Sequence, residues 1–307
     1  DYYLGGEIKL RRDLALKAIE EKVARPLGME VLEAARAMRK VIDANMVDGI
    51  SVVSVQRGED PRKYVMVAAG GAGPVHAASL AKALGIKKIL VNRGSSIFCA
   101  LGSVIADLRH DFVRSVITRT NSADLDLINS YFMEMEALGH GYLEKEGIAP
   151  EDRYFKRSMD MRYKGQFHEV EVPLTTEKER LTKADLRAMA IKFNEMHEDL
   201  YAYRDEVETE IINLRVAAYG KVVTPARKPL PFVGQESDRY IKGEREVFFE
   251  EADGFIATKI YDGDQMESGN IAEGPCIIEQ YTTTIVVPPG GVVEVNEYGD
   301  FLITLEN

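Results

Sequence analysis

An apolar run that leads straight into a glycine cluster decides how the first third of this chain can fold. Residues 64–69 are almost continuously apolar, as in a strand that is buried on both faces of a parallel sheet. The cluster that follows consists of Gly70, Gly71, Ala72, Gly73 and Pro74. A helix is predicted over residues 75–84, with Gly85 just beyond its end, and a second strand over residues 87–91. Strand, turn, helix and strand at this spacing predict a right-handed βαβ unit.

The glycine cluster itself has two interpretations. Residues without a Cβ let the backbone approach a ligand closely, and the N–H groups at the start of the following helix attract an anion. Pro74 suits the first helical turn, where its missing N–H does no harm. A tight turn between a strand and a helix, without any ligand, explains the same residues.

The residues around the cluster narrow the kind of nucleotide that it could contact. A dinucleotide fingerprint needs a third glycine and an acidic residue after the second strand, whereas this chain has His76 and Arg93 there. The GxxxxGK[ST] loop that grips phosphates is absent from the sequence. The turn is therefore suited to the sugar or base of a nucleotide, with another element holding the phosphates.

The periodicity elsewhere predicts further domains. Helices are predicted over residues 13–24, with Asp13 as N-cap, over 31–53 and over 95–108. A mixture of helices and strands follows, over residues 124–146, 153–164, 169–172, 183–200 and 211–223. Prolines and Gly234 then mark a linker, and short apolar runs between turns predict a small β module. The predicted boundaries are a βαβ-containing domain at 1–119, an α+β domain at 120–224, a linker at 225–244 and an acidic all-β module at 245–307.

The negative charge of the chain is confined to its last part. The 307 residues include 39 Lys plus Arg and 50 Asp plus Glu, for a net charge of −11. Residues 245–307 account for all of it, with two basic and thirteen acidic residues. Nucleic-acid binding is not expected, because it needs clustered Lys and Arg. We interpret the acidic stretch as a solvated face, or as a dock for a basic partner.

Cysteine content and hydropathy bear on the cellular compartment. Cys99 and Cys276 stand among apolar residues, which predicts buried thiols rather than nucleophiles, and two cysteines suit a reducing cytoplasm. No apolar run approaches the ~18 residues of a membrane helix, so no membrane association is expected. The first residue is Asp1 rather than Met, which we interpret as a processed product or a piece of a longer chain.

Six segments of the chain together resemble a known family. They lie at residues 1–6, 55–62, 70–76, 106–111, 162–166 and 274–279, and they occur in the family's order. The sequence resembles the hydantoinase/oxoprolinase family, and within it the hydantoinase A type subunit that also occurs in ATP-dependent ketone carboxylases. The resemblance covers essentially the whole chain.

This resemblance implies an α/β fold: the second half of an actin-like ATPase domain, of the sugar kinase and heat-shock chaperone type, followed by the α+β domain and the β module. It implies nucleotide binding by residues Gly70, Gly71, Ala72, Gly73 and Pro74, with the helix that begins near Ser95 beneath the nucleotide. ATP and Mg²⁺ are the implied cofactors. The Asp-x-Gly-Gly-Thr phosphate loop of the family's N-terminal half is absent here, so that half is expected to hold most of the metal's ligands. The implied partners are this N-terminal half and a hydantoinase B type subunit.

Four further polar residues are candidates for substrate or subunit contacts. His76 lies in the first turn of the predicted helix after the glycines, where capping or packing would also explain it. Strand alternation would place Arg162, Lys164, Gln166 and His168 on one face, with a solvated strand as the alternative. Catalytic acids and bases cannot be assigned, and no residue pair has the spacing of metal ligands.

The function that the resemblance implies is that of a subunit of an ATP-dependent enzyme. Such an enzyme activates a small carbonyl or cyclic amide substrate by phosphorylation, leading to hydrolysis of the hydantoinase/oxoprolinase kind or to ketone carboxylation. A non-catalytic, actin-like module for nucleotide binding or assembly is the alternative. The substrate class stays open, because residues 95–100 depart from the Pro-Gly-containing form expected of many hydantoinases.

Overall fold

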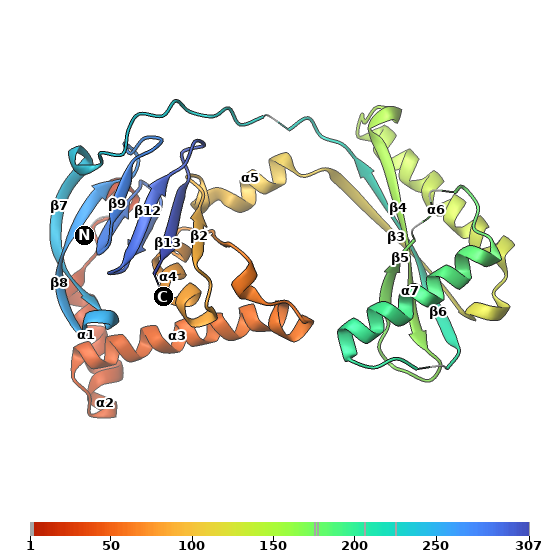
Figure 1. The fold of residues 1–307 in the computed structure, drawn as a ribbon, viewed down its shortest axis with the longest axis horizontal. Coiled ribbons are helices and arrows are strands. Elements are labelled where there is room, and N and C mark those ends of the chain that lie inside the picture. The colour runs from red at the N-terminus through yellow and green to blue at the C-terminus, as the bar shows by residue number, and fades with distance from the viewer. Residues whose placement is uncertain (1–2, 175, 177, 206, 225, 307) are drawn as a thin grey trace. The chain divides into compact units, whose positions relative to one another are not determined.

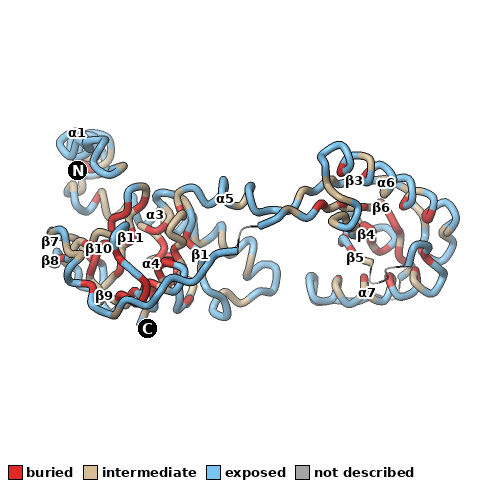
Figure 2. The backbone as a smooth tube through the Cα atoms, turned by 90° about the horizontal axis from the view of Figure 1, so that it is seen from above, coloured by how far each residue is buried: buried red, intermediate tan, exposed pale blue. Residues whose placement is uncertain are grey.

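The computed structural model describes residues 3–174, 176, 178–205, 207–224 and 226–306. The chain forms two compact units (Figure 1): Asp1–Ser103 together with Ala226–Asn307 make the first, and Val104–Pro225 make the second. Each unit contains its own buried strands and helices (Figure 2). Among the residues described, no helix combines the length and apolarity needed to cross a membrane.

The core of the first unit is a five-stranded mixed sheet. Its order is β1 (Met66–Ala68), β2 (Lys88–Val91), β13 (Phe301–Leu305), β12 (Gly291–Val295) and β9 (Ile271–Glu273). β1 and β2 are parallel, and α4 (Gly73–Leu84) connects them, which confirms the predicted strand–helix–strand unit. Ile89, Val293 and Ile303 are fully buried beneath α4 and the neighbouring strands.

The predicted all-β module is not separate from the rest of this unit. β13 pairs antiparallel with β2, so that Phe301 lies opposite Val91 and Ile303 opposite Ile89. All four side chains are fully buried, so the pairing of β13 with β2 is part of the core. The compact units divide after Ser103 rather than at residue 119, and they do not divide at residue 245, because the C-terminal strands complete the sheet that β1 and β2 begin.

A second sheet of the first unit contains part of the acidic segment, residues 245–307. Its order is β11 (Thr284–Val287), β10 (Cys276–Glu279), β8 (Gly254–Asp262) and β7 (Ile241–Phe249), and η9 (Glu250–Ala252) joins β7 to β8. Many of its acidic residues pair with cations from the neutral part of the chain. Examples are Glu250 with Arg36 and Lys40, and Glu251 with Lys82. The predicted linker contacts this unit too: Arg227 binds Asp300, the residue before β13, and β7 already begins at Ile241.

The N-terminal helices differ from the sequence pattern in their ends and in their burial. Asp13 is not an N-cap: α1 (Arg12–Ile19) starts after Arg11, whose guanidinium binds the Asp13 carboxylate. The helical path continues through η2 (Glu20–Ala24) and α2 (Arg25–Leu27), three residues past the predicted end at residue 24. α3 (Val31–Val53) has the predicted bounds, yet Ala34 is its only buried residue. α4 packs between the sheet and α3 (Figure 1).

The predicted helix over 95–108 is shorter than expected. It consists of η5 (Ser95–Ile97) and α5 (Phe98–Ile105), and from Leu108 the chain is already in a strand. The alternation of half-buried and exposed residues from Leu108 to Arg119 has a period of two, which suits a strand that covers a core on one side.

The second unit is an antiparallel sheet with two helices on one face. Its order is β3 (Leu108–Arg119), β6 (Thr209–Gly220), β4 (Arg153–Tyr163) and β5 (Val170–Pro173). The helices are α6 (Leu125–Lys145) and α7 (Lys183–Tyr201), both of which begin and end close to their predicted positions. Phe132 of α6 and Phe193 of α7 pack with Leu214 in its core. A Cβ on Gly139 would lie 2.7 Å from the Cβ of Ala218, so glycine lets α6 approach the sheet.

Candidate functional site

The glycine turn lies at the carboxyl end of β1. Gly70 has a φ of +90°, which a side chain would strain, and its N–H donates to the carbonyl oxygen of Ser95 at 2.7 Å. Gly73 and Pro74 are the first residues of α4, where Pro74 has no N–H and the N–H of Val75 donates to the carbonyl oxygen of Ala72 at 3.1 Å. Gly71 and Ala72 are exposed. The turn thus presents backbone, rather than side chains, to an incoming group.

The turn between β10 and β11 holds the glycine turn from the other side. The Thr283 hydroxyl donates to the carbonyl oxygen of Gly71 at 2.8 Å. A Cβ on Gly71 would lie only 3.2 Å from the carbonyl oxygen of Thr282, which is tighter than ordinary contact. The hydroxyls of Ser96 and Thr282 are 2.5 Å apart. Gly71 is therefore a glycine because two segments of backbone approach closely here.

Two buried polar atoms beside this turn have no hydrogen-bond partner. In the part of the chain that the structure describes, buried unpartnered side-chain atoms are limited to Ser95 Oγ and Gln280 Oε1. Ser95 accepts the hydrogen bond of Gly70, and Gln280 binds the backbone of Thr283, which in turn binds Gly71. Buried polar atoms without partners are rare in native proteins and call for an explanation such as a ligand or water. The exposed glycine backbone and these two atoms make the turn a candidate site for a polar ligand.

His76 is held by a carboxylate from α3. Its Nδ1 lies 2.6 Å from Asp43 Oδ1, and the second oxygen of Asp43 accepts a hydrogen bond from the Ser79 hydroxyl at 2.7 Å. Arg39 approaches the same carboxylate at 3.7 Å and donates to the carbonyl oxygen of Val75. Asp43 thereby fixes the ring of His76 in the first turn of α4. His76 Nε2 has no partner among the described residues.

The predicted face of Arg162, Lys164, Gln166 and His168 does not form. β4 ends at Tyr163, and the chain turns at Lys164, so alternation stops before the last three residues. Arg162 pairs with Glu210 across the sheet, and His168 is exposed beside Phe167. These residues belong to the second unit, whereas His76 belongs to the first.

Gln166 leads to a cluster that the sequence pattern missed. It hydrogen-bonds the side chains of His197 and Tyr203, and His197 Nδ1 lies 3.1 Å from the carbonyl oxygen of Tyr203. His197 is only 2% exposed, with aromatic rings around it. These rings are those of Tyr163, Phe193, Tyr201 and Tyr203. Phe193 and Tyr201 stand four residues before and after His197, a spacing that could have indicated burial.

The two cysteines differ from each other. Cys276 is buried, as predicted, and its burial raises the pKa of the thiol to about 12. Cys99 is exposed on α5, contrary to the prediction from its apolar neighbours. Within the described ranges, no group of three or more His, Cys, Asp or Glu could hold a metal ion.

Fold and turn together define an α/β protein of several sheets, with a glycine turn after the first strand of a parallel pair. The chain belongs to the hydantoinase/oxoprolinase family: residues 1–112 match the family model "Hydantoinase/oxoprolinase", and residues 118–304 match "Hydantoinase/oxoprolinase C-terminal domain".

Several characterised proteins are similar over nearly the whole chain. It is 33% identical to the caprolactamase subunit alpha of Pseudomonas jessenii, over 98% of this chain and 44% of that protein. It is 31% identical to the acetophenone carboxylase gamma subunit of Aromatoleum aromaticum, over 97% of this chain and 42% of that protein. The crystal structure of the ATP-dependent caprolactamase from Pseudomonas jessenii superposes with a TM-score of 0.86 at 32% identity, over 100% of this chain and 45% of that one. The chain thus spans less than half the length of these relatives.

Proposed function

We propose that this chain contributes the nucleotide-contacting glycine turn to a subunit of an ATP-dependent enzyme of the hydantoinase A type. The observation that carries the proposal is the turn at Gly70 and Gly71, with the unpartnered atoms of Ser95 and Gln280 beside it. Similarity to a caprolactamase subunit and to an acetophenone carboxylase subunit supports it, and so does the likeness to the crystal structure of an ATP-dependent caprolactamase.

The residues of the turn would bind the sugar or base of ATP. A Cβ on Gly70 or Gly73 would have no heavy atom within 4 Å, so a ligand could approach the backbone there, and Ala72 lies exposed between them. Gly71 holds the turn against the neighbouring backbone of Thr282, and Pro74 lies in the first turn of α4. When bound, ATP would supply the phosphoryl group that makes a carbonyl oxygen of the substrate a good leaving group. In this proposal the protein around the turn binds and orients, because phosphoryl transfer depends mainly on positioning and on charge.

We further propose that the first unit is half of an actin-like ATPase domain. The nucleotide would then be shared with a polypeptide that corresponds to the N-terminal half of the family's subunit. In this proposal Mg²⁺ is held mainly by that polypeptide, which would carry the phosphate loop. A hydantoinase B type subunit is the second proposed partner.

The proposed substrate is a small carbonyl compound or a cyclic amide. Hydrolysis and ketone carboxylation are both consistent with activation of a carbonyl oxygen, and the named relatives include both chemistries. His76, fixed by Asp43 close to the turn, is the proposed contact of the first unit with substrate or partner. Arg162, Gln166 and His168 remain candidates for such a contact in the second unit.

The test is substrate-dependent ATP hydrolysis by the assembled complex. The protein is purified with its native partners, and ATP hydrolysis is measured with caprolactam, 5-oxoproline, acetone and acetophenone, and without substrate. We expect at least one of these compounds, or a close analogue, to stimulate turnover. ATP hydrolysis that no carbonyl compound stimulates would instead favour a nucleotide-binding assembly module.

A further inference from the structure

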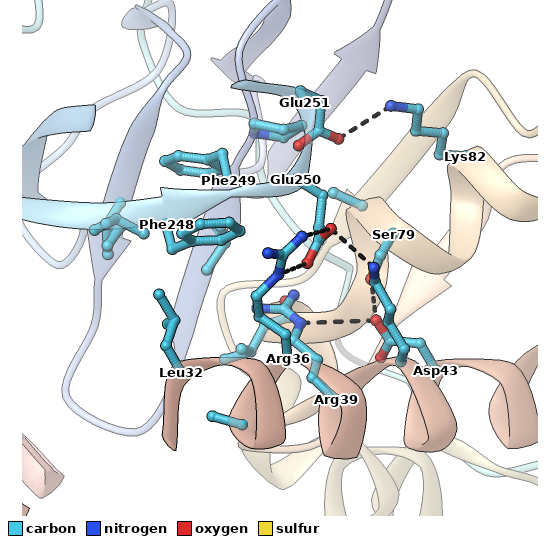
Figure 3. A pocket seen from close by; sticks show the side chains of 18 of the residues that line it. Leu32, Arg36, Arg39, Asp43, Ser79, Lys82, Phe248, Phe249, Glu250 and Glu251 are labelled. Atoms are coloured by element: carbon cyan, nitrogen blue, oxygen red, sulfur yellow. Dashed lines mark hydrogen bonds and ion pairs between the residues drawn. The ribbon is translucent and has the colours of Figure 1, made fainter. Parts of the chain in front are cut away.

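A second site lies on the flank of α4, in a pocket of about 540 Å³ between α3, α4 and the end of β7 (Figure 3). Pockets of this size commonly bind small molecules. None of the five residues of the glycine turn lines it. The pocket is therefore a separate feature from the proposed nucleotide contact, although Val75 and Ser79 of α4 contribute to its wall.

The floor of the pocket is apolar. Phe249 is 5% exposed and Ile277 is 1% exposed, so both belong to the core and contribute little surface to the pocket. Ala78 of α4 is also buried, at 8% exposed. The remaining apolar lining is partly open and comes from the surrounding elements: Leu32, Ala35, Val75, Val247, Phe248, Val286 and Pro288. Open apolar surface inside a concave site is stabilised when an apolar group covers it.

The rim of the pocket carries cations in a fixed arrangement. Arg36 lies with its guanidinium 4.4 Å from the ring centre of Phe248 and binds both oxygens of Glu250, each at 2.9 Å. Lys40, one helical turn further along α3, binds the same carboxylate at 3.0 Å. Figure 3 shows Arg36 reaching up from α3 to Glu250, above Leu32 and beside Phe248. Stacking on an aromatic ring holds the guanidinium in a plane that suits a bidentate carboxylate.

We propose that this pocket binds an amphipathic monocarboxylate, with its apolar body on the floor and its carboxylate on Arg36 and Lys40 in place of Glu250. The contacts of Glu250 already show that Arg36 and Lys40 can bind a carboxylate at this position. Its side chain is 46% exposed, and it lies in the short η9 segment rather than in a long helix. It can therefore turn toward solvent and keep its charge hydrated when a ligand takes its place.

Replacement of Glu250 by a ligand carboxylate is favourable because the ligand also buries an apolar group, whereas Glu250 does not. The hydrogen bonds that Glu250 gives up are replaced in kind, because the ligand carboxylate binds the same two cations and the released Glu250 carboxylate is hydrated. A ligand carboxylate restores the charge-assisted hydrogen bonds, and its attached apolar body covers the pocket floor, which Glu250 cannot do. A neutral amphiphile would cover the floor but leave the cations to Glu250. An amphipathic amine would meet Arg36 and Lys40 with like charge, and its partners in the pocket, Glu250 and Glu251, are already paired with Arg36, Lys40 and Lys82.

The experiment is calorimetric titration of the purified protein with octanoate, octanol and octylamine. We expect octanoate to bind, and to bind at least about tenfold more tightly than either of the others, as for a charge-assisted hydrogen-bond pair. Arg36→Gln should weaken octanoate binding by about tenfold. Glu250→Gln should strengthen it severalfold, because the internal competitor is removed. Ala78→Phe should abolish binding by filling the pocket.

The exposed pair of Arg11 and Asp13 supplies matched controls, since it has the same two-bond geometry outside the pocket. Arg11→Gln and Asp13→Asn should leave octanoate affinity unchanged, and thermal melting checks that every variant folds. The proposal is overturned by equal affinity for octanoate and octanol, by unchanged affinity in Arg36→Gln, or by no binding of octanoate to the folded protein. Weaker binding in Glu250→Gln would also contradict it, because Glu250 would then help the ligand rather than compete with it.

Discussion

Asp43 and His76 join the two helices behind the glycine turn, with Asp43 Oδ1 2.6 Å from His76 Nδ1. The other oxygen of Asp43 is used by Ser79, so a single carboxylate ties the first two turns of α4 to α3. The side chain of Asp43 is 16% exposed, which limits the water available to replace these contacts. The orientation of α4, and with it the direction in which its first N–H groups point, depends on this carboxylate.

Replacing Asp43 with Ala should lower the free energy of unfolding by about 2 kcal/mol, because two hydrogen bonds to a half-buried carboxylate are lost. Urea denaturation followed by circular dichroism measures the change. Asp48→Ala on the same helix is the control, since Asp48 is exposed, and we expect it to change stability by less than about 0.5 kcal/mol. Equal effects of the two substitutions would show that Asp43 does not hold α4.

The cysteines should differ in reactivity. A disulfide reagent at pH 8 should modify one thiol of the native protein quickly, because Cys99 is exposed whereas burial raises the pKa of Cys276 to about 12. The count of reactive thiols should rise to two in denaturant. Cys99→Ser should remove the fast reaction, and Cys276→Ser should leave it unchanged. A fast reaction that survives in Cys99→Ser would contradict the assigned burial of Cys276.

Local patterns in the sequence were sufficient for the elements that build the turn. The spacing of apolar residues gave the bounds of α3 as Val31 and Val53, which the structure has. The parallel pair around α4 was predictable because strand, turn and helix are contiguous and each has its own signal. α3 also shows the limit of such patterns: its apolar residues at threes and fours are mostly exposed, since periodicity marks a face but not what covers it.

Contacts between distant parts of the chain could not be predicted in this way. Thr283 binds the carbonyl oxygen of Gly71 from 212 residues away, and no local pattern links the two. The pairing of β13 with β2 and the ion pairs of the acidic segment likewise join residues that are far apart in the sequence. The sequence predicted an independent, solvated module because the charge of residues 245–307 was considered without the cations of the rest of the chain. In the fold, the basic partner of Glu250 is α3 of the same chain.

The contribution of Glu250 to stability should depend on pH. Hydrogen bonds from Arg36 and Lys40 lower the pKa of Glu250 from 4.5 to about 2, so the folded state favours the charged carboxylate. A carboxylate whose pKa is lower in the folded state than in the unfolded state stabilises the fold at any pH above the unfolded pKa. This stabilisation is lost as the pH falls toward the folded pKa. The difference in unfolding free energy between the native protein and Glu250→Gln should therefore be constant above about pH 5 and shrink steadily below it.

Urea denaturation at half-unit steps from pH 3 to pH 7 measures this difference. Glu246→Gln is the control, because Glu246 is an exposed carboxylate on β7, the strand that leads into η9. Its difference from the native protein should stay near zero across the range. A Glu250→Gln difference that does not change with pH would mean that Arg36 and Lys40 do not hold the carboxylate in solution.

Replacing Gly71 with Val should weaken ATP binding by the assembled complex roughly tenfold, the equivalent of one lost charge-assisted hydrogen bond. A Cβ at this position would lie 3.2 Å from the carbonyl oxygen of Thr282, so the turn must shift away from the backbone that now fixes it. Gly141→Val is the matched control, because a Cβ on Gly141 of α6 has no heavy atom within 4 Å. Equilibrium titration with a fluorescent ATP analogue measures both variants. Unchanged affinity in a folded Gly71→Val complex would remove the turn from the nucleotide site, since the close approach at Gly71 would then serve packing alone.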